Sequence, residues 1–532
     1  MSKETEAGNA KNSTGSNRLA ILLAMAMFVL VVDTSIMNVS ISAIVEDLNT
    51  TVSNVQGAIA LEALVSAAFI LIGSKIGDLF GRKRAYVLGL LGYAIGATTM
   101  TLTQNITTVY IFWAIIGGFG ASLLLPAMQS LIHGNFEGAA QKRVYGLVGA
   151  ATGIAAAVGP LLGGFITTYL SWRVGFLLEV VIIIIVLANI KLVKDVPYTG
   201  PREVDVVGAI LSVVGMGGIV LSILVWQEGG GSVGILMAVG LIAMLLFARW
   251  LVRRKKEGKP VLLDPHLFSS KYFRLGISEQ MVQNIALGGM MIVLPIYFQM
   301  VFEYTAMQTG LALAPFSLSI FFISLLMGRR AGKRRASRII QAGFGIFLLG
   351  MILLIPLVPR ADSGWTFAIP LLIIGSGIGL LVSQLNNYTL SPISEERISE
   401  AAGVNSAAGS FGLSFGLAFA GAIMLAALAF TFTYLTQAST VLAPDQQEQV
   451  AQALEEDAQI MSDSQLEAQL AGQPAEVQEE ILSINTEARN ISLQVALLVP
   501  LIAGLLGFLN SFRMVKMPDL EPTGAAEGML VG

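Results

Sequence analysis

Three acidic residues stand in otherwise apolar stretches of this chain and are the first candidates for chemistry. Asp33 interrupts the run FVLVVDTSIMNVSIS, and Glu62 and Glu179 lie in similar apolar surroundings. An acid at the centre of a membrane-spanning helix costs about 2.5 to 3.5 kcal/mol, so such residues usually face a bundle interior or cavity and serve function. The alternative is that Asp33 packs against neighbouring backbone and serves only the fold.

Composition places these acids in a membrane protein. Of 532 residues, 55% are hydrophobic and only 13% are charged, with a mean hydropathy of +0.74; a soluble protein carries about 25% charged residues. Cysteine is absent, which excludes disulfides, Cys-ligated zinc and Cys nucleophiles. The net charge of −3 favours no nucleic-acid partner.

Apolar stretches of about 20 residues predict fourteen membrane spans. They lie near residues 18-45, 53-74, 85-103, 108-133, 143-168, 174-194, 204-226, 232-252, 274-301, 307-328, 337-358, 365-390, 401-436 and 488-513. An even number puts both termini on one side. With the N-terminus inside, 29 of the 32 basic residues fall in or beside cytoplasmic segments, and only Arg173, Arg360 and Arg489 fall outside.

The expected organisation is an all-α membrane protein with two six-helix bundles and two inserted helices. The segments are a cytoplasmic tail (1-17), an N-terminal bundle (18-199), two inserted spans (200-252), a cytoplasmic linker (253-273), a C-terminal bundle (274-513) containing an extracellular acidic insert (437-489), and a second cytoplasmic tail (514-532). The insert is either a short helical hairpin broken near Gly472 and Pro474 or a solvated acidic loop.

The loop SKIGDLFGRKR at residues 74-84 resembles motif A of the major facilitator superfamily, in the form found in its 14-helix drug:proton antiporters. Glycines there permit a tight turn, an acid can accept hydrogen bonds from a helix N-terminus, and basic residues hold the loop on the cytoplasmic face. The resemblance implies a latch that stabilises the outward-facing state. Its matching residues are Gly77, Asp78, Gly81, Arg82, Lys83 and Arg84.

Two further stretches resemble the same family. The first span is similar to the family pattern DxTIVNVALP through Asp33, Ser35, Ile36, Asn38 and Val39. In the fifth predicted span, VGPLLGG resembles motif C, the antiporter signature, where glycines allow close helix contact and proline bends the helix. The matching residues there are Gly159, Pro160, Gly163 and Gly164.

The departures from the family pattern concern charge. Ala114 stands where motif B of the family carries an arginine often linked to proton coupling, and the neighbouring Trp113 cannot replace a guanidinium electrostatically. Glu62 stands at a usual tyrosine and Glu179 at a usual asparagine. Without a basic residue in nearby spans, three ionised carboxylates are costly in a low dielectric, so at least one should hold a proton, and a bound cation should expel it.

Other polar and aromatic residues are candidates for lining a substrate cavity. Amides could instead form helix-to-helix hydrogen bonds, and aromatics could simply pack rather than stack on flat cations. The candidates are Asn38, Trp113, Phe119, Gln283, Asn284, Tyr297, Phe298, Gln384 and Asn387.

The resemblance implies proton-coupled export of lipophilic, cationic drugs by alternating access across a bacterial cytoplasmic membrane, with both termini cytoplasmic. The expected partners are a lipophilic small molecule, protons and membrane lipids, and a monomer is expected. Export of a lipid or other amphiphile is the alternative. A membrane-embedded enzyme is disfavoured because the sequence shows no HExxH, no GxSxG and no histidine within a span, and we expect no catalytic residues, metal or cofactor.

Overall fold

The structure is a computed structural model that describes residues 3–136, 138–195, 205–227, 231–328, 335–393, 397–443, 447, 450–451 and 463–518. Within these ranges it contains helices and no strand, which confirms the expected all-helical class. The expected boundary at 199/200, much of the insert before residue 463 and the end of the chain after residue 518 lie outside the described residues.

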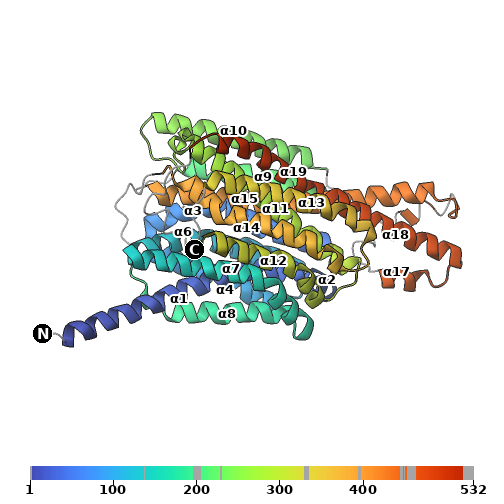
Figure 1. Cartoon of the computed structure of the whole chain (residues 1–532), viewed down its shortest axis with the longest axis horizontal. Helices are drawn as coiled ribbons and strands as arrows, with labels where there is room; N and C mark the ends of the chain where they lie inside the picture. The colour runs from blue at the N-terminus through green and yellow to red at the C-terminus, as the bar shows by residue number, and fades with distance from the viewer. Residues whose placement is uncertain are drawn as a thin grey trace.

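The helices follow one another with short connections (Figure 1). The first half comprises α1 Lys3–Val39, α2 Ile41–Asp47, α3 Val52–Phe80, α4 Arg82–Leu102, α5 Ile106–Thr108, a π-helix at Val109–Gly117, α6 Gly118–Asn135, α7 Gly138–Tyr169, α8 Trp172–Ala188 and the 3-10 turn η2 Ile190–Leu192. The inserted pair is α9 Val206–Gln227 and α10 Val233–Lys256, followed by η3 Pro265–Ser269. The second half comprises α11 Lys271–Met300, α12 Ala306–Gly328, α13 Ala336–Leu354, η4 Ile355–Arg360, η5 Gly364–Phe367, α14 Ala368–Leu390, α15 Ile398–Ala438, α17 Asp463–Leu470, α18 Ala475–Ala496 and α19 Leu498–Val515.

Thirteen helical stretches of the described chain are long and apolar enough to cross a membrane. Helix α8 is apolar too, and its 17 residues make it slightly shorter than the others. Together they account for the fourteen predicted spans.

Hydroxyl side chains fix where several helices begin. Thr51 accepts a hydrogen bond from the backbone N–H of Asn54 at the start of α3 (3.2 Å), and Ser270 caps α11 in the same way. Helix α3 ends at Gly81, whose φ of +103° is a conformation that side chains disfavour. The predicted glycine turn is therefore present, but it is confined to Gly81. The rest of the expected 74-84 loop is helical, because α3 continues to Phe80 and α4 begins at Arg82.

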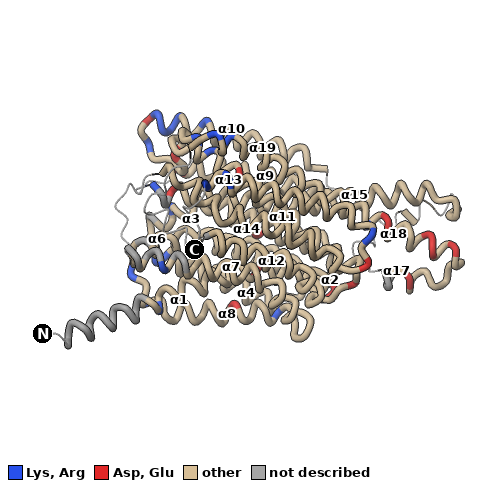
Figure 2. The backbone as a smooth tube through the Cα atoms, viewed as in Figure 1, with Lys and Arg blue, Asp and Glu red and all other residues tan. Residues whose placement is uncertain are grey.

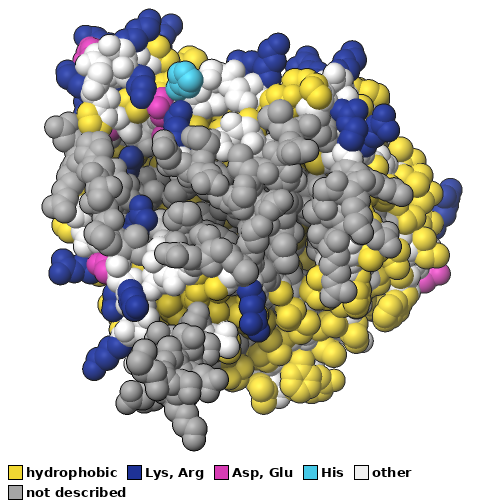
Figure 3. Space-filling model, turned by 60° about the vertical axis from the view of Figure 1, so that its left-hand side comes forward, with side chains coloured by type: hydrophobic (Ala, Val, Ile, Leu, Met, Phe, Trp, Pro, Cys, Tyr) yellow, Lys and Arg dark blue, Asp and Glu magenta, His cyan; other side chains and the backbone are white. Residues whose placement is uncertain are grey.

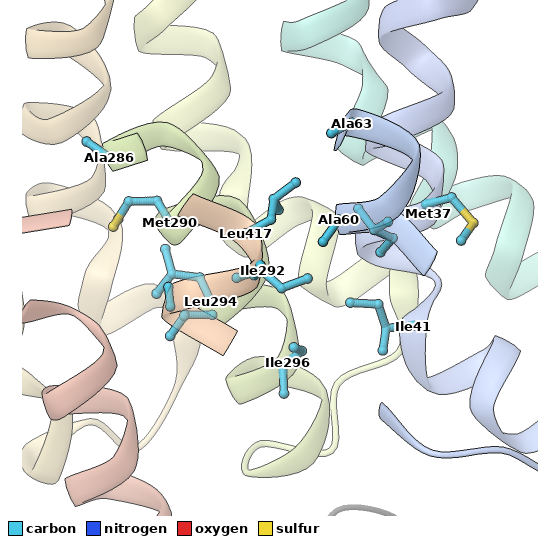
Figure 4. Packing of buried hydrophobic residues seen from close by; sticks show 14 of the residues in the cluster. Met37, Ile41, Ala60, Ala63, Ala286, Met290, Ile292, Leu294, Ile296 and Leu417 are labelled. Atoms are coloured by element: carbon cyan, nitrogen blue, oxygen red, sulfur yellow. The ribbon is translucent and has the colours of Figure 1, made fainter. Parts of the chain in front are cut away.

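The two halves form bundles that contact each other along two seams. In the first half α1 packs on α7 and α8, while α4 packs on α6 and α8; in the second, α11 packs on α15 and α19. The seams between halves are α7 against α12 and α3 against α15, and α9 of the inserted pair touches both α3 and α15. Figure 4 shows apolar side chains meeting at the centre, with Ile41 and Ala60 opposite Ile292 and Ile296.

Charge separates the two ends of the bundle (Figure 2). Basic residues gather at one end, which we call the basic end, while acidic residues lie around α17 and α18 at the other, the acidic end. Figure 3 shows basic side chains around the rim of the basic end and apolar side chains on the adjoining flank. Helices α15 and α18 extend beyond the bundle at the acidic end (Figure 1). The break between α17 and α18 at residues 471–474 matches the expected hairpin.

An ionic cluster joins the linker to both α10 and α15 at the basic end. Burial of the Asp264 carboxyl opposes its ionisation, but hydrogen bonds from Lys255 Nζ and from the His266 N–H (2.9 Å each) and the charge of Arg397 outweigh it, and they hold the pKa of Asp264 below its ordinary value. The backbone N–H of Asp264 also donates to Glu400 at the start of α15 (3.0 Å).

Candidate functional site

Asp33 is buried in the first bundle and is held by two aromatic donors. Its side chain is 1% exposed. The Tyr93 hydroxyl of α4 donates to Asp33 Oδ2, and the Trp113 indole N–H lies 3.2 Å from both carboxyl oxygens. The structure therefore favours a polar site around Asp33 over packing against backbone alone, since α1, α4 and the π-helix all contribute to it.

Trp113 reaches Asp33 from a segment with unusual geometry. The nine residues Val109–Gly117 form a π-helix, which is rare and often found at functional sites. This segment includes Ala114, the position of the missing motif B arginine. The indole thus supplies a neutral N–H donor to the carboxyl, close to where the family pattern has a cation.

Glu179 and Glu62 complete an acidic cluster around Tyr93. Glu179 in α8 is 1% exposed, and neither carboxyl oxygen has a hydrogen-bond partner among the described residues. Glu62 in α3 is half-buried. Each glutamate interacts electrostatically with Asp33. The charges of all three acids also oppose ionisation of the Tyr93 hydroxyl.

The cluster has no basic counter-ion in the described part of the chain. No Lys or Arg forms an ion pair with Asp33, Glu62 or Glu179 there. Uncompensated charge at such burial is costly, so the arrangement favours carboxyls that are protonated or matched by a bound cation. The structure brings together the three acids that the sequence singled out.

The motif C glycines place α7 against α1 beside Asp33. A Cβ on Gly159 would lie 2.6 Å from Ser35 Oγ, and one on Gly163 would lie 3.0 Å from Ile36 Cα. Gly164 instead faces α12, where a Cβ would lie 2.5 Å from the Ala306 carbonyl oxygen. Pro160 lies inside α7. The motif therefore packs the acid-bearing helix on one side and the second bundle on the other.

The 74-84 stretch, where α3 turns into α4, is bound to the end of the first bundle. The Lys83 backbone N–H donates to Asp195 Oδ1 (3.0 Å), and Lys83 Nζ donates to the Val193 carbonyl (2.7 Å). Asp195 also approaches Gly81, where a Cβ would lie 2.9 Å from its Oδ2. The side chain of Asp78, expected to accept hydrogen bonds here, lies outside the described residues. Gly77 lies in α3, and Arg82 and Arg84 begin α4.

The expected cavity aromatics of α11 pack against other aromatics. Phe298 is fully buried and stacks on Phe302 and Phe367. Tyr297 is 3% exposed and donates to Asn490 Oδ1 (2.6 Å). Phe119 meets the ring of Phe69 edge-on. Their placement favours the packing alternative for all three.

Some of the amide side chains expected to line the cavity form hydrogen bonds within their own helices, and some have a buried oxygen without a partner among the described residues. Asn38 donates to the Thr34 carbonyl and Asn284 to the Gln280 carbonyl, both within one helix turn. Gln384 is 1% exposed and lies beside Ser383. Buried side-chain oxygens without a hydrogen-bond partner among the described residues belong to Asn38, Gln283 and Asn387.

Sequence reasoning missed several residues that the structure brings to these sites. The sequence did not single out Tyr93, because tyrosines are ordinary residues in apolar spans. Asp195 follows a span that ends at a charged loop, where acids are common. Glu279 in α11 is a fully buried acid within a predicted span, and it carries the same sequence signal as Asp33.

Comparison with known proteins identifies the family. The family model of the Major Facilitator Superfamily matches residues 23–205 and 204–417. The chain belongs to the major facilitator superfamily. It is a multi-pass membrane transporter and not an enzyme.

Relatives of the chain are named for multidrug resistance, for antibiotic resistance or for transport. The chain is 27% identical to multidrug resistance protein Stp of Mycobacterium tuberculosis (strain CDC 1551 / Oshkosh), over 77% of this chain and 76% of that protein. It is 27% identical to puromycin resistance protein pur8 of Streptomyces alboniger, over 77% of this chain and 82% of that protein. It is 23% identical to a probable actinorhodin transporter of Streptomyces coelicolor, over 74% and 70%.

Solved structures confirm the major facilitator fold. A crystal structure of a peptide transporter, POT, in complex with sulfate has a TM-score of 0.56 and 14% identity, and the match covers 83% of this chain and 92% of that chain. At this identity the similarity concerns the fold alone.

Proposed function

We propose that this major facilitator transporter exports lipophilic cations in exchange for protons, using the carboxyls of Asp33, Glu62 and Glu179. The observation that carries the proposal is an acidic cluster around Tyr93, with Asp33 and Glu179 buried, that has no basic partner in the described chain. Such carboxyls favour binding either protons or a cation, and that competition is what exchange requires. The names of the drug-resistance relatives support a lipophilic substrate.

The proposal assigns separate tasks within the cluster. Asp33 keeps two neutral hydrogen-bond donors whatever its charge, so it is the carboxyl best able to ionise and attract a cation. Glu179 has no such donor among the described residues, so its neutral form is favoured and it carries the proton. The Tyr93 hydroxyl donates to Asp33 and interacts electrostatically with both glutamates, so it couples the three acids.

We infer an orientation from charge. Basic residues on the inside are the common arrangement in membrane proteins, so the basic end faces the cytoplasm of a bacterium and the acidic insert faces outward. Both termini are then cytoplasmic.

Vesicle transport tests the proposal. Purified protein reconstituted in liposomes should move a cationic dye such as ethidium when a pH gradient is imposed. Asp33→Asn should abolish the movement, and at least one of Glu62→Gln and Glu179→Gln should reduce it strongly, whereas Glu46→Gln at an exposed position should not. Full pH-driven activity in all three cluster variants would refute the assignment.

The same vesicles distinguish the alternative of lipid or amphiphile export. A fluorescent phospholipid should remain unmoved where the dye is transported. Movement of the lipid without the dye would contradict the cation proposal while leaving the transporter family intact.

A further inference from the structure

A buried glutamine joins the two bundles at the acidic end. Gln299, near the end of α11, is 4% exposed. Its side-chain Nε2 donates to the Val39 carbonyl (3.0 Å), and its Oε1 accepts from the Ser42 backbone N–H (2.8 Å). The two bonds cross from the second bundle to the first.

The helix break at Ser40 explains why an amide fits there. Helix α1 ends at Val39 and α2 begins at Ile41, so a carbonyl at the end of one helix and an N–H at the start of the next lack intrahelical partners. A primary amide offers both a donor and an acceptor, and it satisfies both groups at once. Ser40 itself bonds Thr167 of α7 through their hydroxyls (2.6 Å). Gln299 therefore supplies, from the second bundle, the partners that two backbone groups at this helix break in the first bundle require.

Helix α18, which begins in the insert and continues into the last span, contacts the same turn of α11. Arg489 of α18 is 5% exposed and donates to the carbonyl of Met300, the residue after Gln299 (2.5 Å). Asn490 Oδ1 accepts a hydrogen bond from the hydroxyl of Tyr297, which lies two residues before Gln299 (2.6 Å). Gln299 thus lies between the first bundle and the helix that extends beyond the bundle.

We propose that Gln299 is a latch that holds the bundles closed at the acidic end, and that α18 of the insert positions this latch. The inference rests on the proposed alternating-access transport for its purpose, but its test needs neither substrate nor a proton gradient. When the bundles separate at this end, both Gln299 bonds must break, while the bonds between α18 and α11 lie within the second half and can persist. Movement of the insert against α11 then changes the stability of the closed state.

Distance measurement between the bundles tests the latch directly. The chain has no cysteine, so spin labels at Glu46→Cys and Asp362→Cys, both exposed, report only on this end. Loss of two hydrogen bonds in Gln299→Met should raise the ratio of open to closed populations about 10- to 30-fold, which pulsed electron paramagnetic resonance in nanodiscs detects. Unchanged populations in this folded variant would refute the latch.

A matched glutamine provides the control. Gln494 of α18 donates to the carbonyl of Ile355 at the end of α13 (2.9 Å), so it also caps a helix end, but within one bundle. Gln494→Met should leave the distance distribution unchanged. An equal shift in both variants would mean general destabilisation and would overturn the proposal.

Gln299→Glu provides a readout that packing alone would not change. A protonated carboxyl has one donor and an acceptor and can make both Gln299 bonds, whereas a carboxylate can only accept. This variant should therefore be closed at low pH and open at high pH, relative to the unsubstituted chain under the same conditions. A pH-independent distribution would contradict the role of the amide.

The insert's part is tested through α18. Tyr297→Phe removes one hydroxyl bond without changing shape, and Arg489→Met removes the bond to Met300; each should shift the populations in the same direction as Gln299→Met but less. The two proposals can fail separately. If Gln299→Met shifts the populations as expected but the unsubstituted protein moves no dye, the proposed function alone is refuted. If the unsubstituted protein moves the dye but Gln299→Met leaves the populations unchanged, this inference alone is refuted.

Discussion

Substituting alanine for Gly310 tests the close seam between α7 and α12. A Cβ at this position would lie 2.3 Å from the carbonyl oxygen of Pro160, in the motif C stretch, whereas ordinary contact begins at 3.4 Å. The two helices must therefore separate by about 1 Å, because the obstacle is backbone and not a movable side chain. Overpacking of this kind costs about 1 to 3 kcal/mol.

That cost falls on the state in which the bundles are closed at the acidic end. We expect Gly310→Ala to shift the closed-to-open ratio about 5- to 150-fold toward open and to reduce dye export correspondingly. The assay combines the spin-label distance between positions 46 and 362 with the vesicle transport rate. The Met307 N–H, which donates to Thr168 Oγ1 of α7 (2.9 Å), should lose its partner at the same time.

Gly345→Ala is the matched control. This glycine in α13 faces only the edge of the Phe508 ring at 3.4 Å, within the second half of the chain. Alanine favours helix over glycine by about 1 kcal/mol, so this variant should be as active and at least as stable as the parent. If Gly310→Ala gave the same distances and rates as Gly345→Ala, the reasoning from the α7 and α12 contact would be wrong.

The remaining predictions address the acid site and the basic end. Trp113→Phe removes the indole donor from Asp33, a hydrogen bond worth about 1 to 3 kcal/mol when buried, and should lower dye export about tenfold or more in vesicles; unaltered export would argue against the indole's role. Because the pKa of Asp264 is lowered, its ionised form stabilises the fold above the ordinary carboxyl range, and that stabilisation is lost as pH falls through the lowered pKa. Thermal unfolding in detergent should therefore show a smaller loss of Tm between pH 7 and pH 3 for Asp264→Asn than for the parent, and equal losses would count against the cluster. Asp195→Ala removes the acceptor of the Lys83 N–H and should speed trypsin cleavage after the basic residues at the start of α4; unchanged cleavage would show that the contact does not hold the turn between α3 and α4.

Much of the architecture follows from the sequence because the membrane imposes simple rules. A span needs about 20 apolar residues, and its backbone must bond within the helix, so hydropathy locates helices directly. The distribution of basic residues then separates the two ends, as Figure 2 shows. Each of the three basic residues that fall outside has a partner: Arg173 pairs with Asp47, Arg489 donates to the Met300 carbonyl, and Arg360 donates to the Pro356 carbonyl.

The sequence alone identified Asp33, Glu62 and Glu179 as candidates, because placing an acid in an apolar membrane span costs free energy whichever way its side chain faces. Helical spacing could not show that Tyr93 and Trp113 converge on Asp33. That convergence depends on how α4 and the π-helix rotate against α1, and the π-helix changes the facing of Trp113 relative to ordinary helical spacing.

The residues that join the two bundles were decided only by the tertiary structure. Gln299 is one polar residue in an apolar span and the sequence did not single it out, yet it caps a helix break some 257 residues earlier in the chain. Gly310 and Pro160 likewise meet across separate bundles. Sequence determines which groups need partners, because helix ends and buried acids must be satisfied. The packing of distant helices decides which residues become those partners, since local periodicity carries no information about which faces meet.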